Sequence, residues 1–382
     1  MTYRNIVYLD NAASSFPKPQ CVIDRMTTVM RNNTANPGRS GHKLSDANAK
    51  LIYDARQTVA SFLGIGDFPE NIIFTHSATH ALNIVINGIL QKGDSVIISD
   101  MEHNSVLRPL EEKVADGLLD LKIAVTEHED ELTVINFENL IDEKTKMIIV
   151  THASNVNGKV LPIEKLSVLC KKYGIILCVD ASQTIGHLDC NLKTLGIDIL
   201  CASGHKGLFG PQGTGILALN GDIKIRPLIF GGTGGKSLLH RQPEGFPESL
   251  ESGTQNTVGI AGLSEGIKYL NRFGAKLESN ADSLYKLLYN EFNSCKDINV
   301  YSEKFNKTHT YAFNIKDKSS EEVTYYLNNH NICVRGGFHC SALFHEKMQT
   351  LSQGIVRVSI GGFNSENDIK KLVYVCKKIA RT

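Results

Sequence analysis

A lysine enclosed by glycines is the residue of this 382-residue chain best suited to covalent chemistry. Lys206 stands in the segment 203–207, and a second glycine-rich run follows at 210–215. Glycine lets a backbone approach another group closely, which a surface lysine does not need. Burial would lower the pKa of this lysine, and its neutral amine could form a Schiff base. Ser203 and His205 could hold a phosphate of the same ligand. A nucleotide-binding loop is the competing interpretation, but neither of its glycine motifs occurs here.

Three other polar positions also follow predicted strands. Asp180 ends the apolar run 175–179 and could pair with a protonated pyridine nitrogen, although capping of the next helix explains a lone aspartate equally well. His103 could stack on an aromatic ligand or move a proton, although a hydrogen-bonded side chain is the default for a lone histidine. Residues 77–79 could bind phosphate at a helix start through free N–H groups and Thr79, although a simple N-cap is favoured for that segment alone. No structural requirement accounts for the whole set in this order.

The elements that would position these residues are strands alternating with helices. Short apolar runs at 72–75, 95–98, 147–150, 175–179 and 198–201 predict buried strands, and helical spacing predicts helices such as 79–90 and 163–173. This alternation predicts an α/β fold with a mainly parallel sheet, whose ligands collect beyond the carboxyl ends of the strands. Helices at 258–273, 275–292, 320–329 and 366–379 with strands at 310–315 and 355–359 predict a smaller α+β domain. We expect a large domain at 15–255 and a small domain formed by 1–14 and 256–382.

Composition narrows the classes of function. The 41 Lys and Arg against 40 Asp and Glu give a net charge of +1 without a basic run, which argues against nucleic acid or an anionic membrane surface as a partner. The apolar runs are too short to span a membrane, and residues 1–10 lack the long apolar stretch typical of a signal peptide. The nine cysteines contain no Cys-x-x-Cys pair, so we expect a cytoplasmic protein without a metal site.

Taken together, the motifs resemble those of the class V aminotransferase group of fold type I pyridoxal-phosphate (PLP) enzymes. Within that group they resemble the cysteine desulfurases and selenocysteine lyases, with a group II (SUF-type) arrangement. The resemblance covers nearly the whole chain and is carried by residues 8–15, 36–42, 77–79, 102–104, 154–158, 179–183, 203–206, 251–256, 335–340 and 356–359. It implies a large domain with a mainly parallel seven-stranded sheet.

The resemblance also implies a cofactor site for PLP. It makes Lys206 the imine lysine and pairs Asp180 with the pyridine nitrogen. It places His103 on the ring as a stacking and catalytic residue, with Gln183 and Asn155 near the ring hydroxyl. The phosphate would be held by the remaining members of the predicted site, which are Ala78, Thr79, Ser203, His205 and, from the second subunit of a homodimer, Thr254.

For the substrate, the resemblance implies an amino acid whose carboxylate is clamped by the planar guanidinium of Arg357. Asn155, Arg335 and His42 are the other implied substrate-binding residues.

Cys340 decides which reaction is expected. Taken alone, it would be an inert core cysteine, but the resemblance implies a nucleophile that takes sulfur from L-cysteine as a persulfide and releases alanine. It stands 17 residues before Arg357, in a glycine-rich segment at 335–342 that we expect to be mobile. The short spacing resembles enzymes that pass sulfur to an acceptor protein. A selenocysteine lyase, a cystine lyase, an aminotransferase and a non-catalytic PLP-binding protein are the alternatives, and the scattered cysteines argue against an iron–sulfur carrier.

Overall fold

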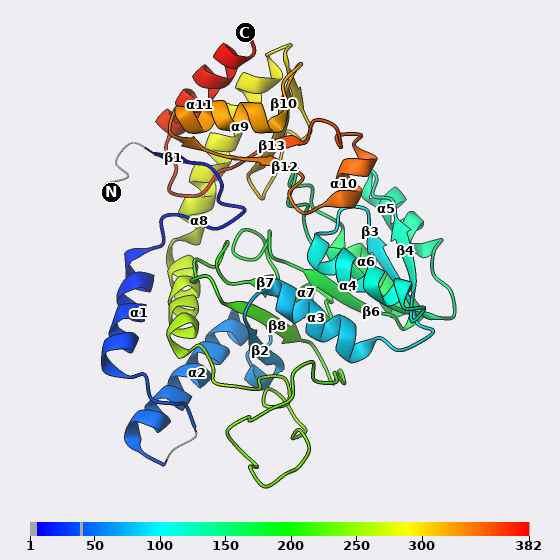
Figure 1. Cartoon of the computed structure of the whole chain (residues 1–382), viewed down its shortest axis with the longest axis vertical. Coiled ribbons are helices and arrows are strands. Elements are labelled where there is room, and N and C mark those ends of the chain that lie inside the picture. The colour runs from blue at the N-terminus through cyan, green and yellow to red at the C-terminus, as the bar shows by residue number, and fades with distance from the viewer. Residues whose placement is uncertain (1–5, 39–40, 382) are drawn as a thin grey trace.

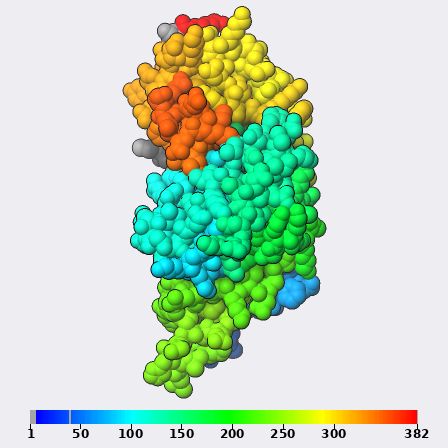
Figure 2. Space-filling model, turned by 90° about the vertical axis from the view of Figure 1, so that its right-hand side faces the viewer, coloured from blue at the N-terminus to red at the C-terminus, as the bar shows by residue number. Residues whose placement is uncertain are grey.

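The computed structural model describes residues 6–38 and 41–381, which form two lobes joined by a long helix (Figure 1). Of the predicted small-domain segment 1–14, residues 1–5 lie outside this described part, as do residues 39 and 40 of the motif at 36–42. Figure 2 shows the orange C-terminal segment that contains α10 (Ala342–Lys347) against the cyan and green residues of the large lobe. The two lobes therefore meet where that segment lies.

The large lobe contains one seven-stranded sheet in the order β2-β8-β7-β6-β5-β3-β4. Its strands are β2 (Ile72–Thr75), β3 (Ser95–Ser99), β4 (Asp120–Ala124), β5 (Thr145–Thr151), β6 (Ile176–Asp180), β7 (Ile199–Ser203) and β8 (Gly215–Leu219). Strand β8 runs in the direction opposite to the other six strands, so its pairs with β2 and β7 are antiparallel and every other pair in this sheet is parallel. The predicted mainly parallel seven-stranded sheet is confirmed, and β4 and β8 are added to the five strands located from apolar runs.

Both faces of the sheet are covered. In β5, Ile148 and Val150 belong to one hydrophobic cluster, whereas Met147 and Ile149 belong to another. Successive side chains of a strand point to opposite faces, so each cluster lies on one face. Full burial of each such side chain contributes about 1.5–3 kcal/mol. This double burial explains why the central strands appear in the sequence as continuous apolar runs.

In the described part of the chain, seven helices and one short 3-10 turn belong to the large lobe. They are α1 (Gln20–Asn32), α2 (Lys43–Phe62), η1 (Pro69–Asn71), α3 (Ala78–Ile89), α4 (Asn104–Ala115), α5 (Asp130–Glu138), α6 (Ile163–Tyr173) and α7 (Leu192–Leu195). Helix α6 has the predicted bounds, and Gly174 ends it in the left-handed region at φ 67°. Within the described ranges, no helix is both long and apolar enough to cross a bilayer.

Helix α8 (Thr257–Asn293) runs unbroken for 37 residues, so the prediction of two helices at 258–273 and 275–292 is wrong. A glycine at position 274 costs about 1 kcal/mol relative to alanine in a helix. Packing at both ends outweighs that cost. Ile267 belongs to a large-lobe core, while Leu284 and Leu288 belong to the small-lobe core. One helix thus joins the two lobes.

The small lobe contains a four-stranded antiparallel sheet in the order β12-β13-β10-β9 and a separate parallel pair, β1 with β11. Its elements are β1 (Val7–Tyr8), β9 (Ile298–Val300), β10 (Thr310–Ile315), α9 (Ser320–Asn329), β11 (Ile332–Cys333), β12 (Arg335–Gly337), α10, β13 (Ile355–Ser359) and α11 (Glu366–Ile379). Val7 and Leu9 pack in its core. The exact domain boundaries stay a prediction.

Candidate active site

The carboxyl ends of the central strands bring polar residues to one edge of the large sheet. Thr151 at the end of β5 lies beside Asp180 at the end of β6, which pairs in register with Cys201 of β7. Lys206 follows the end of β7 after a tight turn. A Cβ on Gly207 would lie 2.2 Å from the carbonyl oxygen of Ile185, so this glycine permits a close approach between two loops. Gly207 is therefore needed for a close contact between two segments of the protein itself.

The N-terminal segment holds the backbone of the predicted imine lysine. Ser15 Oγ donates to the carbonyl oxygen of Lys206 at 2.9 Å, and Lys18 Nζ donates to that of His205 at 2.7 Å. Burial lowers the pKa of Lys18 to about 8. These contacts fix the path of the chain on both sides of the Lys206 peptide.

Charges from both lobes act on the Lys206 amine. Burial lowers its pKa from 10.5 to about 8; the Asp180 carboxylate opposes this shift, while the charges of Arg357 and Arg335 add to it. The negative charge of a Cys340 thiolate acts in the same sense as Asp180. Because the pKa is about 8, a usable fraction of the amine is neutral near neutral pH. A neutral lysine amine is a nucleophile.

Two neighbouring side chains at the start of α4 are held neutral. Burial raises the pKa of Glu102 to about 8, so this carboxyl is mainly protonated at neutral pH. Its Oε1 lies 2.5 Å from Ser99 Oγ and accepts the Thr151 N–H at 2.9 Å. Burial lowers the pKa of His103 to about 4, although the charge of Asp180 opposes the shift. His103 therefore presents a neutral ring.

The phosphate-binding candidates have different environments. The side chain of Ser77 caps α3, as expected for a simple N-cap, and Ala78 beside it is buried. Thr79 is exposed in this single chain, whereas Ser203 is buried. His205 Nδ1 is buried with no hydrogen-bond partner among the described residues. A buried, unpartnered ring nitrogen is an available contact for a polar group of a ligand.

The Cys340 segment makes contacts that attach it to the large lobe, and its expected mobility stays a prediction. The Asn104 N–H at the start of α4 donates to the carbonyl oxygen of Cys340 at 2.7 Å, and β12 and α10 enclose the turn. Cys340 itself has φ 57° and is exposed, the only such case among nine cysteines that all lie in the described part. Arg335 Nη2 lies 3.8 Å from its Sγ. A guanidinium therefore lies beside the only exposed thiol of the described residues.

Asn155 attaches the same turn to the large lobe. Its Nδ2 donates to the carbonyl oxygen of His339 at 2.7 Å, and its Oδ1 accepts from Ser341 Oγ at 2.6 Å. Both polar atoms of this amide, which was expected near the cofactor ring hydroxyl, thus hydrogen-bond to the turn that carries Cys340. The expected partner of that hydroxyl, Gln183, donates from Nε2 to the carbonyl oxygen of Ala12 at 3.2 Å.

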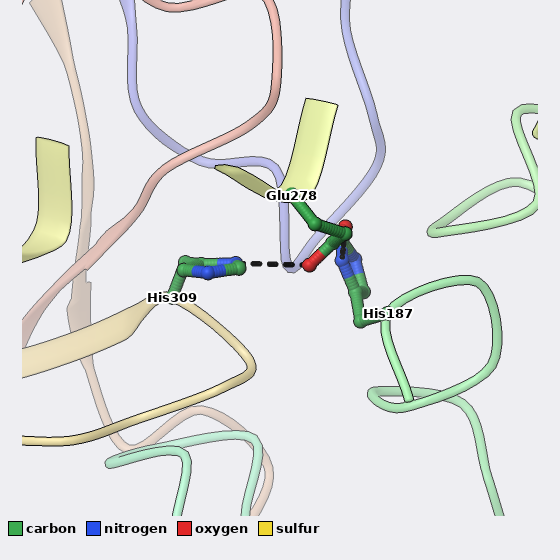
Figure 3. A group of neighbouring side chains, drawn as sticks. All are labelled: His187, Glu278 and His309. Atoms are coloured by element: carbon green, nitrogen blue, oxygen red, sulfur yellow. Dashed lines mark hydrogen bonds and ion pairs between the residues drawn. The ribbon is translucent and has the colours of Figure 1, made fainter. Parts of the chain in front are cut away.

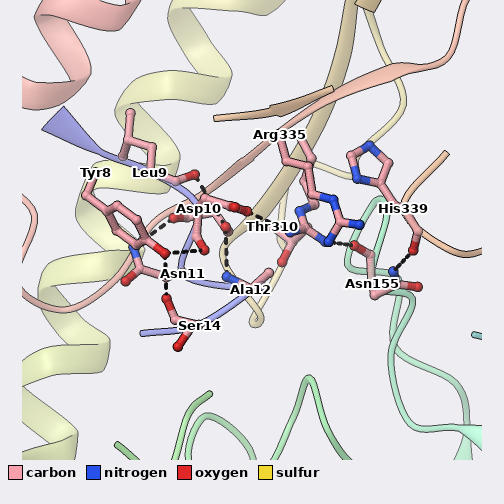
Figure 4. Close-up of polar contacts among 12 residues, drawn as sticks. Tyr8, Leu9, Asp10, Asn11, Ala12, Ser14, Asn155, Thr310, Arg335 and His339 are labelled. Carbon is pink, nitrogen blue, oxygen red and sulfur yellow. Dashed lines mark hydrogen bonds and ion pairs between the residues drawn. The ribbon is translucent and has the colours of Figure 1, made fainter. Parts of the chain in front are cut away.

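Arg357 is buried in β13, with 1% of its surface exposed. Its Nη2 lies 2.7 Å from Asp10 Oδ1, and its Nη1 donates to the carbonyl oxygen of Asn155 at 2.8 Å. Nε has no partner among the described residues. Figure 4 shows Asp10 on the N-terminal segment and Asn155 on the opposite side of this cluster. Two fixed contacts thus hold the guanidinium, and a donor remains for a ligand carboxylate.

Two predicted residues are not brought to this site within the single chain. His42 is exposed, and its Nδ1 accepts the Ser45 N–H at 3.2 Å as the N-cap of α2. Thr254 is exposed in the segment before α8. Their assigned roles stay predictions.

Three residues of the site had no role assigned from the sequence. Asp10, Glu102 and Ser15 all fell inside the motifs that carried the resemblance. Their functions depend on partners far along the chain, such as Arg357 for Asp10 and Lys206 for Ser15. Their position in those motifs was the only available signal.

Comparison with known proteins agrees with this geometry. The model of the family "Aminotransferase class-V" matches residues 7–372. The chain belongs to the class-V aminotransferase family. It is 32% identical to a probable cysteine desulfurase of Methanothermobacter thermautotrophicus over 99% of this chain and 95% of that protein. It is 31% identical to a cysteine desulfurase of Yersinia pestis over 98% of this chain and 94% of that protein.

Among solved structures, the apo form of a cysteine desulfurase from Thermococcus onnurineus NA1 superposes with a TM-score of 0.91 at 30% identity. The match covers 99% of this chain and 95% of that one. Class-V aminotransferases are fold type I PLP enzymes, so the predicted fold class is confirmed.

Proposed function

We propose that this chain is a PLP-dependent cysteine desulfurase, which converts L-cysteine to L-alanine and keeps the sulfur on Cys340 as a persulfide. The observation that carries the proposal is the position of Cys340. Its exposed thiol stands on a turn fixed to the start of α4, beside Arg335 and within the electrostatic reach of Lys206. The names of the relatives support the same reaction.

The residues at the sheet edge fit PLP. Lys206 offers a partly neutral amine for covalent attachment, and Asp180 offers a buried carboxylate for a protonated ring nitrogen. His205 offers a buried, unpartnered Nδ1 suited to a phosphate, and neutral His103 offers a face for stacking. When bound, PLP supplies an electron sink that stabilises negative charge on the substrate carbon.

Substrate orientation comes from Arg357. The guanidinium meets the α-carboxylate in a charge-assisted contact, and its bonds to Asp10 and Asn155 keep its plane fixed. The Lys206 amine, when neutral and not bound to the cofactor, would accept the α proton of the substrate.

Cys340 performs the sulfur transfer. Its thiolate forms an S–S bond with the substrate sulfur, and the substrate C–S bond breaks with its electron pair retained on carbon. That carbon then takes a proton and becomes the methyl group of alanine. The sulfur is oxidised and the carbon reduced, so no external oxidant or reductant is needed. The Arg335 guanidinium lies 3.8 Å from the attacking sulfur.

The proposal includes a homodimer, a cytoplasmic location and a sulfur-acceptor protein. Exposed Thr254 and His42 would complete the site of a second subunit. Exposed apolar side chains near Thr254, including Ile229 and Phe230, support an interface on this side of the large lobe. All nine cysteines are free, as a reducing compartment requires. The exposed Cys340 is open to an acceptor.

The decisive experiment compares Cys340→Ala with Cys295→Ala, a control at a half-buried cysteine in the small lobe. Both variants should retain the visible absorbance of lysine-bound PLP. After incubation with L-cysteine, wild type and the control should form alanine, and their Cys340 peptide should gain the mass of one sulfur atom. Cys340→Ala should form no protein persulfide. Full sulfur delivery by Cys340→Ala would refute the role of Cys340, and comparison of cysteine, selenocysteine and cystine as substrates separates the alternative lyases.

A further inference from the structure

A second cluster of ionisable side chains lies at the junction of the two lobes. His187 comes from the loop after β6, Glu278 from the middle of α8 and His309 from the residue before β10. One donor atom from each of the three lies within 4.8 Å of the others. Figure 3 shows the Glu278 carboxylate between the two imidazole rings. Three segments far apart in sequence thus place two ring nitrogens and a carboxylate around one point.

The orientation of His309 indicates a ligand. This side chain is 1% exposed, and its Nε2 lies 2.9 Å from Asp282 Oδ1. A carboxylate at that distance fixes the proton on Nε2 and leaves the lone pair on Nδ1. Nδ1 has no hydrogen-bond partner among the described residues and lies 3.7 Å from Glu278 Oε2. A buried lone pair that faces a carboxylate is repelled by it, and a cation bound between the two removes that repulsion.

The other histidine completes the donor set. His187 Nδ1 lies 2.8 Å from Glu278 Oε1. The side chains of His187 and Glu278 are 25% and 27% exposed, so an ion can reach them from solvent and both can adjust. Ligand atoms that share a tetrahedral zinc ion lie about 3.3 Å apart, given bond lengths of about 2.0–2.1 Å. The two separations from Glu278, 2.8 and 3.7 Å, lie on either side of that value, and all three donors lie within 4.8 Å of one another, so small side-chain movements would bring them to one ion.

We propose that His187 Nδ1, the Glu278 carboxylate and His309 Nδ1 bind one divalent transition-metal ion of the zinc class. Two imidazoles and a carboxylate are a zinc donor set, and a water molecule fills the fourth position. Asp282 is a positioning residue that orients His309 from outside the ligand shell. The expectation of a chain without a metal site rested on cysteine patterns, which say nothing about this set.

The location assigns the ion a structural role. The loop that carries His187 begins directly after Asp180 and also carries Gln183. It packs against Gly207, the residue after Lys206, where an added Cβ would lie 3.2 Å from His187 Nε2. His309 precedes the central β10–β13 pair of the small lobe, which contains Arg357. The ion would therefore fix the small lobe to the loop that supports the cofactor.

The test uses the PLP-saturated enzyme, stripped with a chelator and then incubated with Zn²⁺ or, as a control, Mg²⁺. Wild type should retain one zinc per chain after gel filtration, and X-ray absorption at the zinc edge should show nitrogen and oxygen ligands without sulfur. At a hundredfold excess over Kd, zinc should raise the melting temperature by about 3 °C, and Mg²⁺ should not. Less than stoichiometric zinc, or zinc bound through sulfur, would overturn the proposal.

Variants locate the ion. His187→Gln, at a partly exposed position, should lose the bound zinc and the thermal shift, and His309→Gln should do the same. Asp282→Asn should weaken zinc affinity by about 10- to 100-fold, as expected for loss of an outer carboxylate. His128→Gln is the matched control, because His128 is exposed and remote in sequence from the cluster. Equal zinc retention by His187→Gln and His128→Gln would exclude the site.

Discussion

The buried amine of Lys206 should make the stability of the cofactor-free protein depend on pH in a defined direction. Its pKa is about 8 in the folded chain, against the ordinary lysine value of 10.5 that applies once the chain unfolds. Between these values the unfolded state binds more protons, so the free energy of unfolding rises with pH. Each pKa unit is worth 1.36 kcal/mol, so the full gain is about 3 kcal/mol. The gain is absent below pH 8 and complete above pH 10.5.

Lys206→Met removes the titrating group while keeping most of the side-chain volume. For 382 residues, an unfolding entropy of about 2.1 cal/mol/K per residue gives about 0.8 kcal/mol/K for the chain. The melting temperature of wild type relative to Lys206→Met should therefore rise by about 4 °C from pH 7 to pH 10.5. The assay is thermal unfolding of the two apoproteins across this range, followed by circular dichroism.

A surface lysine provides the control. Lys92 is exposed, so Lys92→Met should shift the melting temperature by the same amount at every pH. The reasoning is refuted if the difference between wild type and Lys206→Met stays constant from pH 7 to pH 10.5. A falling difference would refute it as well, because it would mean that the folded state stabilises the charged amine.

Three further predictions concern neighbouring residues. A lysine in Arg357→Lys cannot make both contacts of the guanidinium. Steady-state kinetics should show kcat/KM for cysteine lowered about 10- to 100-fold, which corresponds to the loss of one hydrogen bond to a charged group. Asn155→Asp replaces the donor facing the His339 carbonyl with an acceptor, so persulfide formation measured by mass spectrometry should slow while PLP absorbance is kept. Folding lowers the pKa of His103 from the ordinary histidine value of 6.5 to about 4, so protonation favours unfolding. Wild type should therefore lose up to about 3 kcal/mol relative to His103→Gln between pH 6.5 and pH 4, measured by urea unfolding.

The sequence was most informative where one local pattern controls the structure. The double-sided burial of β5 and β6 leaves continuous apolar runs, and the bounds of α6, α9 and α11 follow from periodicity and end signals. Asp180 could be located because it ends such a run, and Lys206 because it stands in the glycine-rich turn that follows the next one. Edge strand β4 is partly exposed and lacks that signal, so it was not located.

Long-range contacts explain the remaining differences. Gly274 is a helix breaker by local preference, yet α8 continues because two separate cores hold its halves. The amide of Asn155 has its partners at positions 339 and 341, more than 180 residues away, and its expected place beside the cofactor stays a prediction. Nothing near Asn155 in the sequence indicates a partner in the other lobe, so only the assembled fold could show it.

The small-lobe sheet places Arg335, which lies beside Cys340, next to Arg357. Arg335 of β12 and Arg357 of β13 are register partners on adjacent antiparallel strands, so their side chains lie on the same face. Arg335 faces Cys340, whereas Arg357 is held by Asp10 and Asn155. With the proposed roles, a substrate carboxylate held at Arg357 would lie beside the strand that carries Arg335 and next to the turn that carries Cys340.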